Sequence, residues 1–349
     1  MSVTSVSVVS PGRTSSGGTA FSSGLVPELE QVLGAQVLQA SAPAVGRLVL
    51  PEAVGKSSHI IFLGSRAVPV QGAKVIFWPL NVAPLEQHVV KMENSSPRNR
   101  LRHRLLKRRL EHSVRAADGL VFGSNHARTL YMGAFAAAAT RPYIVNRGGA
   151  PSLGGVPQEG RGPRLRGGRR LILMVSHLYP YKGILEFVQA VGSVRHQLPD
   201  DVEFRVAGAD RDRTYAARVH AEVRSLGLQD RLVIKEAAPD EMATLYGRAD
   251  LAVFASTCEN AGSFALYDGL FAGLPTLCSD RSSMPEMVAG HVQFVNPFER
   301  QRFGAALLSL VTDERRRRVL ANDAGAWAAS APTWKQRAEQ LVAFLEQLD

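Results

Sequence analysis

Cysteine is scarce in this chain, and long apolar runs are missing. Two cysteines, Cys258 and Cys278, stand among 349 residues, which excludes a disulfide framework and indicates a reducing compartment. No uncharged apolar run approaches the roughly 20 residues that a helix needs to cross a bilayer. The first residues, MSVTSVSVVSPGR, lack the basic and then apolar order of a secretory signal. We therefore expect a cytoplasmic protein, with peripheral contact at the inner face of the membrane as the alternative.

The usual nucleotide-binding and metal-binding signatures are absent too. The loop after the first expected strand, PGRTSSGGTAF, is neither GxGxxG nor a Walker sequence, which counts against an oxidoreductase with a nicotinamide cofactor. Its Gly17 and Gly18 still allow a ligand to approach the backbone closely, with a plain turn as the alternative. The nine histidines show no HExxH-like spacing and no cluster with cysteine, so no metal is expected.

Positive charge is concentrated in two segments. The chain carries a net charge of +10, of which residues 98–115 contribute +7 and residues 161–170 contribute +5, so the remainder is net −2. A localised charge implies a localised anionic partner, such as a phosphate group, an anionic lipid or a nucleic acid. The alternative is a solvated helix followed by a basic linker.

Short apolar runs alternate with helical patterns almost from end to end. Such an alternation indicates βαβ units and parallel sheets, in which ligands bind at the carboxyl ends of the strands. The expected strands fall in two series. The first comprises residues 5–9, 37–40, 59–63, 74–78, 120–123 and 143–146, and the second comprises residues 171–176, 204–207, 232–235, 252–255, 276–278 and 293–295.

A segment rich in Gly, Pro and Arg separates the two series of strands. It has no apolar periodicity, which is typical of a linker. The pattern predicts a Rossmann-like domain over residues 1–150, a linker over 151–170 and a second Rossmann-like domain over 171–331. Residues 332–349 have the pattern of an amphipathic helix. We expect an α/β protein in which two doubly wound domains face each other across a cleft.

Two constellations in the second series have side chains suited to chemistry. An apolar strand leads into His177, a Tyr-Pro-Tyr turn and Lys182 at the start of a helix. A lysine there can reach a diphosphate as a point charge, and a lysine in solvent is the alternative. Further on, STCENAGSFALYDGLFAGLP places Glu259 and Asn260 in a loop and Asp268 on the following helix. Carboxylates so placed can accept hydrogen bonds from sugar hydroxyls.

These features, in this order and spacing, resemble glycosyltransferase family 4, the retaining GT-B enzymes also called group 1 transferases. The strand–turn–KG segment, the glutamate-containing loop, the AGLP turn and MPEMV carry the resemblance within residues 171–311. It is weaker in residues 1–150, where FWPLNVAPLE and GLVFGSNHARTLY look like the acceptor domain of the family. The resemblance implies sugar transfer from a nucleotide-diphosphate donor, without a metal or other cofactor. The implied acceptor is a hydroxyl of a glycan, a lipid-linked saccharide or a natural product.

The resemblance also implies roles for individual side chains. Lys182 would bind the donor diphosphate together with His177, which stands where the family usually has arginine. Glu259 would lie near the donor sugar, and Asp268 would hold the ribose hydroxyls. These two acids lie one residue further apart than the pair of the family, so Asn260 competes with Glu259 for the first position.

Backbone groups and the first domain would supply the remaining contacts. The start of the helix after the glutamate-containing loop would hold the phosphates, through Gly262, Ser263 and Phe264, and Gly17 and Gly18 would be further donor contacts. Asn81 and His88 would bind the acceptor. The last helix of the chain would return to the N-terminal domain.

The triplet Asp210-Arg211-Asp212 spells DxD, a metal–nucleotide signature of the other large glycosyltransferase fold. Here it follows the end of an expected strand and opens a helix. That position favours an N-cap role over metal binding.

The basic segment over residues 98–115 has three interpretations. Leu106, Leu110 and Val114 recur every four residues, so one stripe can pack on a core while charges cover the other faces. Those charges suit an anionic membrane or a phosphate-bearing acceptor. A solvated helix and a nucleic-acid surface are the alternatives, although no aromatic residue interleaves with the arginines. The alternative to an enzyme is a non-catalytic protein on a degenerate transferase fold that binds nucleic acid or membrane.

Overall fold

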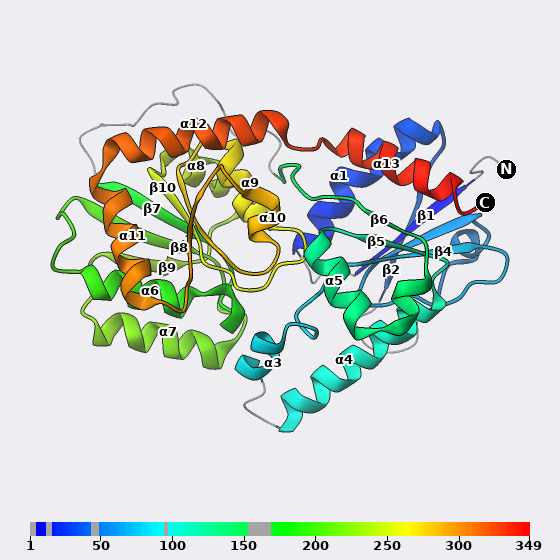
Figure 1. The fold of residues 1–349 in the computed structure, drawn as a ribbon, viewed down its shortest axis with the longest axis horizontal. Coiled ribbons are helices and arrows are strands. Elements are labelled where there is room, and N and C mark those ends of the chain that lie inside the picture. Colours follow the sequence, from blue (N-terminus) through cyan, green and yellow to red (C-terminus); the bar gives the residue numbers. More distant parts are fainter. Residues whose placement is uncertain (1–4, 12–15, 43–48, 94–96, 153–168) are drawn as a thin grey trace. The chain divides into compact units, whose positions relative to one another are not determined.

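The computed structural model describes residues 5–11, 16–42, 49–93, 97–152 and 169–349, and its fold is drawn in Figure 1. The chain divides into two compact units. Unit 1 holds Met1–Ser152 and Pro332–Asp349, and unit 2 holds Leu153–Ala331. Each unit contains a six-stranded sheet in which all paired strands are parallel. The predicted α/β architecture of parallel, doubly wound sheets is confirmed.

Unit 1 has the strand order β2-β1-β3-β4-β5-β6. Its strands are β1 (Val6–Pro11), β2 (Leu38–Ala42), β3 (His59–Gly64), β4 (Lys74–Pro79), β5 (Gly119–Phe122) and β6 (Tyr143–Val145). Its helices are α1 (Ser16–Leu33), α2 (Glu52–Gly55), α3 (Gln87–Glu93), α4 (Pro97–Ala116), α5 (Asn125–Ala134), the 3-10 helix η1 (Ala136–Thr140) and α13 (Trp334–Glu346). The central strands read as nearly continuous apolar runs because helices cover both faces of a parallel sheet.

Helix α13 belongs to unit 1, although it follows the whole of unit 2 in the sequence. It packs against α1. Arg337 of α13 is only 3% exposed; its Nε donates to Asn146 Oδ1 at 2.9 Å, and Asn146 Nδ2 donates to the Arg337 carbonyl at 2.9 Å. The guanidinium also lies 4.7–5.6 Å from three ring centroids, those of Phe21, Trp78 and Trp334. Hydrogen bonds and cation–π contacts thus fix α13 to the core of unit 1.

Unit 2 has the strand order β12-β11-β10-β7-β8-β9. Its strands are β7 (Arg170–Val175), β8 (Val202–Ala207), β9 (Leu232–Lys235), β10 (Leu251–Phe254), β11 (Thr276–Ser279) and β12 (Gln293–Val295). Its helices are the 3-10 helix η2 (Pro180–Lys182), α6 (Ile184–Val194), α7 (Arg213–Ser225), α8 (Pro239–Arg248), α9 (Phe264–Phe271), α10 (Met284–Val288), α11 (Arg300–Thr312) and α12 (Glu314–Ser330).

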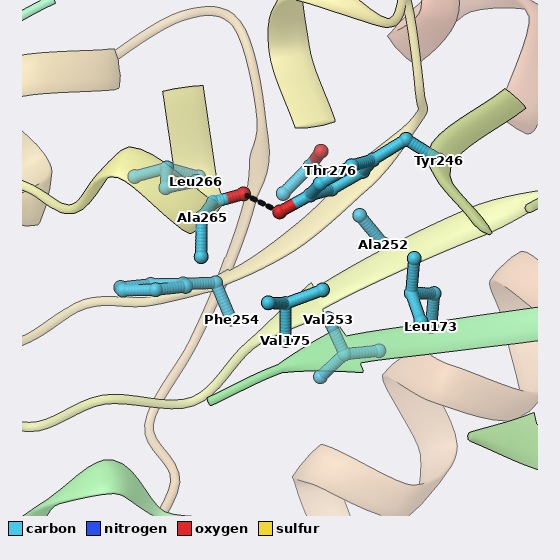
Figure 2. A pocket seen from close by; sticks show the side chains of 9 residues that line it. All are labelled: Leu173, Val175, Tyr246, Ala252, Val253, Phe254, Ala265, Leu266 and Thr276. Carbon is cyan, nitrogen blue, oxygen red and sulfur yellow. Dashed lines mark hydrogen bonds between the residues drawn. The ribbon is translucent and has the colours of Figure 1, made fainter. Parts of the chain in front are cut away.

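Side chains of successive residues in the strands of unit 2 pack on opposite faces of its sheet. In β10, Leu251 and Val253 pack in the cluster that contains α6, α7 and α11, whereas Phe254 packs with α9, α10 and α12. An internal void of about 10 Å³ lies where α8 and α9 meet the sheet, beside Tyr246, whose hydroxyl donates to the Ala265 carbonyl at 2.9 Å (Figure 2). This space barely holds one water molecule, so it is a packing void rather than a ligand site.

Some expectations differ from the structure or lie outside it. Gly17 and Gly18 were expected in the loop before the first helix, but they lie in the first turn of α1, since that helix begins at Ser16. Most of the expected linker, residues 153–168, lies outside the described residues. Among the described helices, none combines the length and the apolar character needed to span a bilayer.

Candidate functional site

The sheet of unit 2 has a topological switch point between β7 and β10. From β7 the chain continues to β8 and β9 on one side, and β10, β11 and β12 then fill the other side. In doubly wound sheets, ligands bind in the crevice at the carboxyl ends of the two strands that flank such a point. The segments that follow these strands, residues 176–183 and 255–263, contain His177, Lys182, Glu259 and Asn260, four of the residues expected to bind a donor.

The two segments are fastened to each other by backbone contacts. The Thr257 amide donates to the Tyr181 carbonyl at 2.8 Å, and the Thr257 hydroxyl donates to the same oxygen at 3.1 Å. Gly183, with a φ of 72°, passes so close to Ala255 that an added Cβ would lie 2.1 Å from the Ala255 carbonyl oxygen. Only glycine fits there. Side chains on the two segments therefore have fixed relative positions.

Lys182 and Glu259 meet across the switch point. The Lys182 ammonium donates a hydrogen bond to Glu259 Oε1 and forms an ion pair with it, and it lies 5.4 Å from the centroid of the Tyr181 ring. Burial alone would lower the pKa of Lys182, but the Glu259 carboxylate outweighs it and raises that pKa well above its ordinary value. Lys182 therefore stays charged at neutral pH. The structure brings together these two predicted residues, which lie 77 positions apart.

His177 lies at the end of β7, in the same segment as Lys182. Its Nδ1 accepts the Ala209 N–H at 3.1 Å. Burial lowers the pKa of His177 below its ordinary value, and the neighbouring Arg211 lowers it further. The ring is thus neutral at pH 7. Since Nδ1 is the acceptor, the proton sits on Nε2, which leaves that nitrogen able to donate to an anion.

The segment after β10 turns sharply into α9. Gly262 has a φ of 72°, and an added Cβ would lie 2.2 Å from the Tyr267 hydroxyl. Ser263 is the N-cap residue of α9, yet its hydroxyl makes no capping bond. Helix α9 begins at Phe264, directly after the loop that contains Glu259 and Asn260. Its N-terminus carries a partial positive charge.

Asp268, the second predicted acid, lies on α9 and is 4% exposed. Burial raises the pKa of Tyr246 well above its ordinary value, and the charge of Asp268 raises it further. Asp268 therefore lies close to the Tyr246 side chain. Its contact with a ribose stays a prediction.

The DxD triplet caps a helix. Asp212 is the N-cap residue of α7, and its Oδ1 accepts the Tyr215 N–H at 3.0 Å, which confirms the N-cap interpretation. Asp210 Oδ2 lies 3.4 Å from His220 Nε2.

Unit 1 has its own polar cluster at the carboxyl ends of β4 and β5. The Asn81 carbonyl accepts the Tyr131 hydroxyl at 2.8 Å, which ties the loop after β4 to α5. His88 Nδ1 lies 3.6 Å from the buried Glu86 carboxylate, and His126 Nε2 lies 2.6 Å from the other Glu86 oxygen. Sequence reasoning named Asn81 and His88 but missed Glu86 and His126. The sequence signal that could have found them is their position in the connections that follow the neighbouring strands β4 and β5, Glu86 just before α3 and His126 in the first turn of α5.

Part of the chain is similar in sequence to a known protein family and to known proteins. Residues 158–327 match the family model described as glycosyl transferases group 1. A mannosylfructose-phosphate synthase from Agrobacterium fabrum is 25% identical over 184 residues, which are 51% of this chain and 40% of that protein. A GDP-mannose-dependent α-(1-6)-phosphatidylinositol monomannoside mannosyltransferase from Mycolicibacterium smegmatis is 24% identical over 66% of this chain and 62% of its own length. The chain spans less than two thirds of the length of these curated relatives.

Solved structures share the fold at low sequence identity. WaaG, a glycosyltransferase involved in lipopolysaccharide biosynthesis, superposes with a TM-score of 0.72 and 14% identity, over 97% of this chain and 98% of its own. A sucrose-phosphate synthase from Thermosynechococcus elongatus superposes with a TM-score of 0.71 and 14% sequence identity, over 98% of both chains. Anabaena HepE in complex with UDP-glucose superposes with a TM-score of 0.70 and 14% sequence identity, over 98% of this chain and 99% of that one.

Proposed function

We infer that this chain, whose residues 158–327 match the group 1 glycosyl transferase family and whose fold matches that of GT-B glycosyltransferases, moves a sugar from a nucleotide-diphosphate donor to a hydroxyl acceptor with retention at the anomeric carbon. The observation that carries the proposal is the Lys182–Glu259 pair at the switch point of unit 2. The HepE structure with UDP-glucose and the name of the GDP-mannose-dependent relative support a sugar nucleotide as donor.

The proposed chemistry needs positive charge and hydrogen-bond donors around the departing diphosphate. The Lys182 ammonium has three N–H groups, so it can keep its bond to Glu259 and still donate to a phosphate oxygen. His177 Nε2–H and the amides at the start of α9, from Gly262 to Phe264, would add donors that are already in place before the reaction. Asp268 would hold the ribose. The chemistry would use no metal and no other cofactor.

The proposed reaction breaks the bond between the anomeric carbon and the diphosphate oxygen and forms a bond from the same carbon to the acceptor oxygen. The acceptor attacks from the face that the diphosphate leaves, and its hydroxyl proton passes to a phosphate oxygen. No side chain acts as nucleophile. Unit 1 would bind the acceptor, with Asn81 and His88 near it. The acceptor class is a glycan, a lipid-linked saccharide or a natural product.

A thermal-shift panel of UDP, GDP, ADP and dTDP sugars tests the proposal. A donor present at 100 times its dissociation constant should stabilise the protein by about 2.7 kcal/mol. The Lys182→Ala variant should lose most of that stabilisation. A panel in which no sugar nucleotide stabilises or is hydrolysed would argue instead for a non-catalytic protein on the same fold.

Helix α4 supports an anionic membrane as a further partner. Its buried side chains, including His103, Leu110 and Val114, share one face, while Leu101 and Leu105 are 57% and 54% exposed. At 100° per residue these two leucines lie on the side opposite the buried face, among arginines. In Figure 1 the N-terminal end of α4 projects away from the sheet of unit 1. Exposed leucines within a basic face suit a helix that lies in the interface of an anionic bilayer.

The membrane proposal places the protein in the cytoplasm, in peripheral contact with the inner face of the membrane. Within the described part of the chain, no ion pair neutralises Arg102, Arg104 or Arg108. The arginines would interact with anionic headgroups, and the two leucines would enter the outer part of the acyl region. A nucleic-acid surface suits α4 less well, because exposed leucines gain nothing from phosphates.

A further inference from the structure

Two serines from another loop hold the backbone of Glu259. Ser282 and Ser283 follow β11 and precede α10. The Ser282 hydroxyl accepts the Glu259 N–H at 3.0 Å and donates to the Glu259 carbonyl at 2.8 Å. The Ser283 hydroxyl donates to the same carbonyl at 3.0 Å and accepts the Gly262 N–H at 2.9 Å. Both backbone polar groups of Glu259 are thus bonded to this pair of serines.

Each serine departs from the local rule for its position. Ser282 has a φ of 56°, and it is the one non-glycine residue with positive φ among the described residues. Serine seldom adopts that conformation, which costs free energy. Ser283 is the N-cap residue of α10, but its hydroxyl makes no capping bond to that helix, although capping is the usual role of an N-cap serine. Both hydroxyls are instead directed to the Glu259 loop.

We propose that Ser282 and Ser283 are positioning residues that hold Glu259 against Lys182, so that the Lys182 ammonium is correctly placed for the donor diphosphate. The inference rests on the proposed function for the role of the Lys182–Glu259 pair. The four hydrogen bonds between the serines and the loop reach its backbone, at Glu259 and Gly262. Their effect on the reaction would pass through the Glu259 carboxylate.

The first test measures the pair itself and needs no donor. Without a fixed Glu259, burial lowers the pKa of Lys182, so the amine reacts faster with an acylating reagent. We expect Ser282→Gly, Ser283→Ala and Glu259→Gln each to raise the labelling rate of Lys182 several-fold, by mass spectrometry on the full chain. Ser282→Gly combined with Glu259→Gln should be no faster than Glu259→Gln alone.

Matched variants separate positioning from general loosening. Ser282→Gly suits the left-handed backbone and removes only the hydroxyl. Ser279→Ala is the control, since the Ser279 hydroxyl bonds within its own segment, accepting the Arg281 N–H at 3.2 Å. Amide exchange at Glu259 should speed up in Ser282→Gly, and exchange at Gly262 should speed up in Ser283→Ala. Neither should change in Ser279→Ala.

The second test uses donor hydrolysis. Ser282→Gly should lower kcat about 10-fold and change KM for the donor less than about 3-fold, because a displaced group costs rate more than ground-state binding. A wild-type labelling rate of Lys182 in both Ser282→Gly and Ser283→Ala would overturn the inference. Absence of hydrolysis in the wild-type protein would overturn the proposed function instead, and the labelling result would still decide whether the serines position Glu259.

Discussion

At the Lys182–Glu259 pair, burial and attraction act in opposite directions on one proton. A buried ammonium without a partner would release its proton, and a buried carboxylate without a partner would bind one. Together they stay charged, and Lys182 keeps a pKa above its ordinary value. The pair as a whole is neutral, and the Lys182 ammonium is its positive end, in a segment whose His177 is neutral. An arriving diphosphate would interact with an ammonium that is already protonated and largely buried.

Loss of the Lys182 ammonium should slow the reaction strongly. We expect Lys182→Ala to lower turnover by about 10²–10³-fold, since it removes a charge directed at the departing diphosphate. Donor hydrolysis measured by nucleotide release checks this. Lys56→Ala is the matched control, because Lys56 forms an exposed ion pair with Glu52 at 2.5 Å, and it should leave the rate unchanged. Equal rates in the wild type and a folded Lys182→Ala would remove Lys182 from the mechanism.

The lowered pKa of His177 makes stability depend on pH. The folded protein binds a proton at His177 less readily than the unfolded chain does, because of burial and then Arg211. The stabilisation by the neutral ring is therefore complete above about pH 6.5, the unfolded value, and is lost as pH falls towards the folded pKa. Denaturant unfolding of wild type and His177→Gln between pH 8 and 5 measures it. As pH falls, the unfolding free energy of the wild type should decrease relative to that of His177→Gln. A difference between the two proteins that does not change with pH would contradict the assignment.

At the scale of elements, the strands were the most predictable part of the chain. Each of the twelve predicted strands lies within two residues of an observed one, because a strand buried on both faces must be apolar throughout. Helix starts were harder, and α1 begins before Gly17 rather than after Gly18. The stripe of Leu106, Leu110 and Val114 was found, with Leu110 and Val114 fully buried.

Other features depend on contacts that no local pattern encodes. The exposed position of Leu101 and Leu105 on α4 was not predicted, since leucines at this spacing usually belong to a core. The bonds of Ser282 and Ser283 to Glu259 depend on a left-handed residue and a turn more than 20 positions away. Residue types can suggest a site, but the pairing of side chains across loops comes only from the fold.

Helix α4 should carry the protein to anionic membranes. We expect binding to phosphatidylserine-containing vesicles at low salt and release at high salt, as screening shortens the range of the charges. Replacing Arg102, Arg104 and Arg108 with Gln should weaken binding about 10²-fold, at about 1 kcal/mol per basic residue. Vesicle co-sedimentation measures this, and donor hydrolysis should persist.

Two further variants sharpen the membrane test. Leu101→Ser with Leu105→Ser leaves the charge intact and should weaken binding if the leucines enter the bilayer. Replacing Arg315, Arg316 and Arg318 of α12 with Gln removes the same charge from unit 2 and should have little effect. Wild-type protein that ignores anionic vesicles at low salt would contradict the proposal and favour a soluble acceptor.

At the scale of the whole molecule, the strand orders explain where the candidate residues gather. In each sheet, the direction in which successive strands are added reverses once. In unit 2 this reversal brings the ends of β7 and β10 side by side. Segments about 75 positions apart thereby form one site. Six-stranded parallel sheets were predictable from the alternation of elements, whereas the neighbours of β7 become known only from the structure.

Arg337 should be critical for unit 1 alone. We expect Arg337→Met to destabilise unit 1 by about 3 kcal/mol, because it leaves the buried Asn146 Oδ1 without the Arg337 Nε donor and removes three cation–π contacts. Amide exchange resolved by segment should show faster exchange in β1, α1 and β6 and unchanged exchange in unit 2. Lys335→Ala, an exposed position on the same helix, is the control. Equal loosening of both units would mean that α13 serves more than unit 1.

The position of α13 has a consequence for synthesis of the protein. Residues 1–152 are synthesised before unit 2, yet the side of α1 that α13 covers and the buried Asn146 gain their partners only after all of unit 2 has been made. Unit 2 is continuous and can fold as it emerges, whereas unit 1 needs a contact spanning 191 positions. The half of the protein that is translated first is therefore the half that is completed last. During that interval its uncovered apolar surface is the part of the nascent chain most in need of a chaperone.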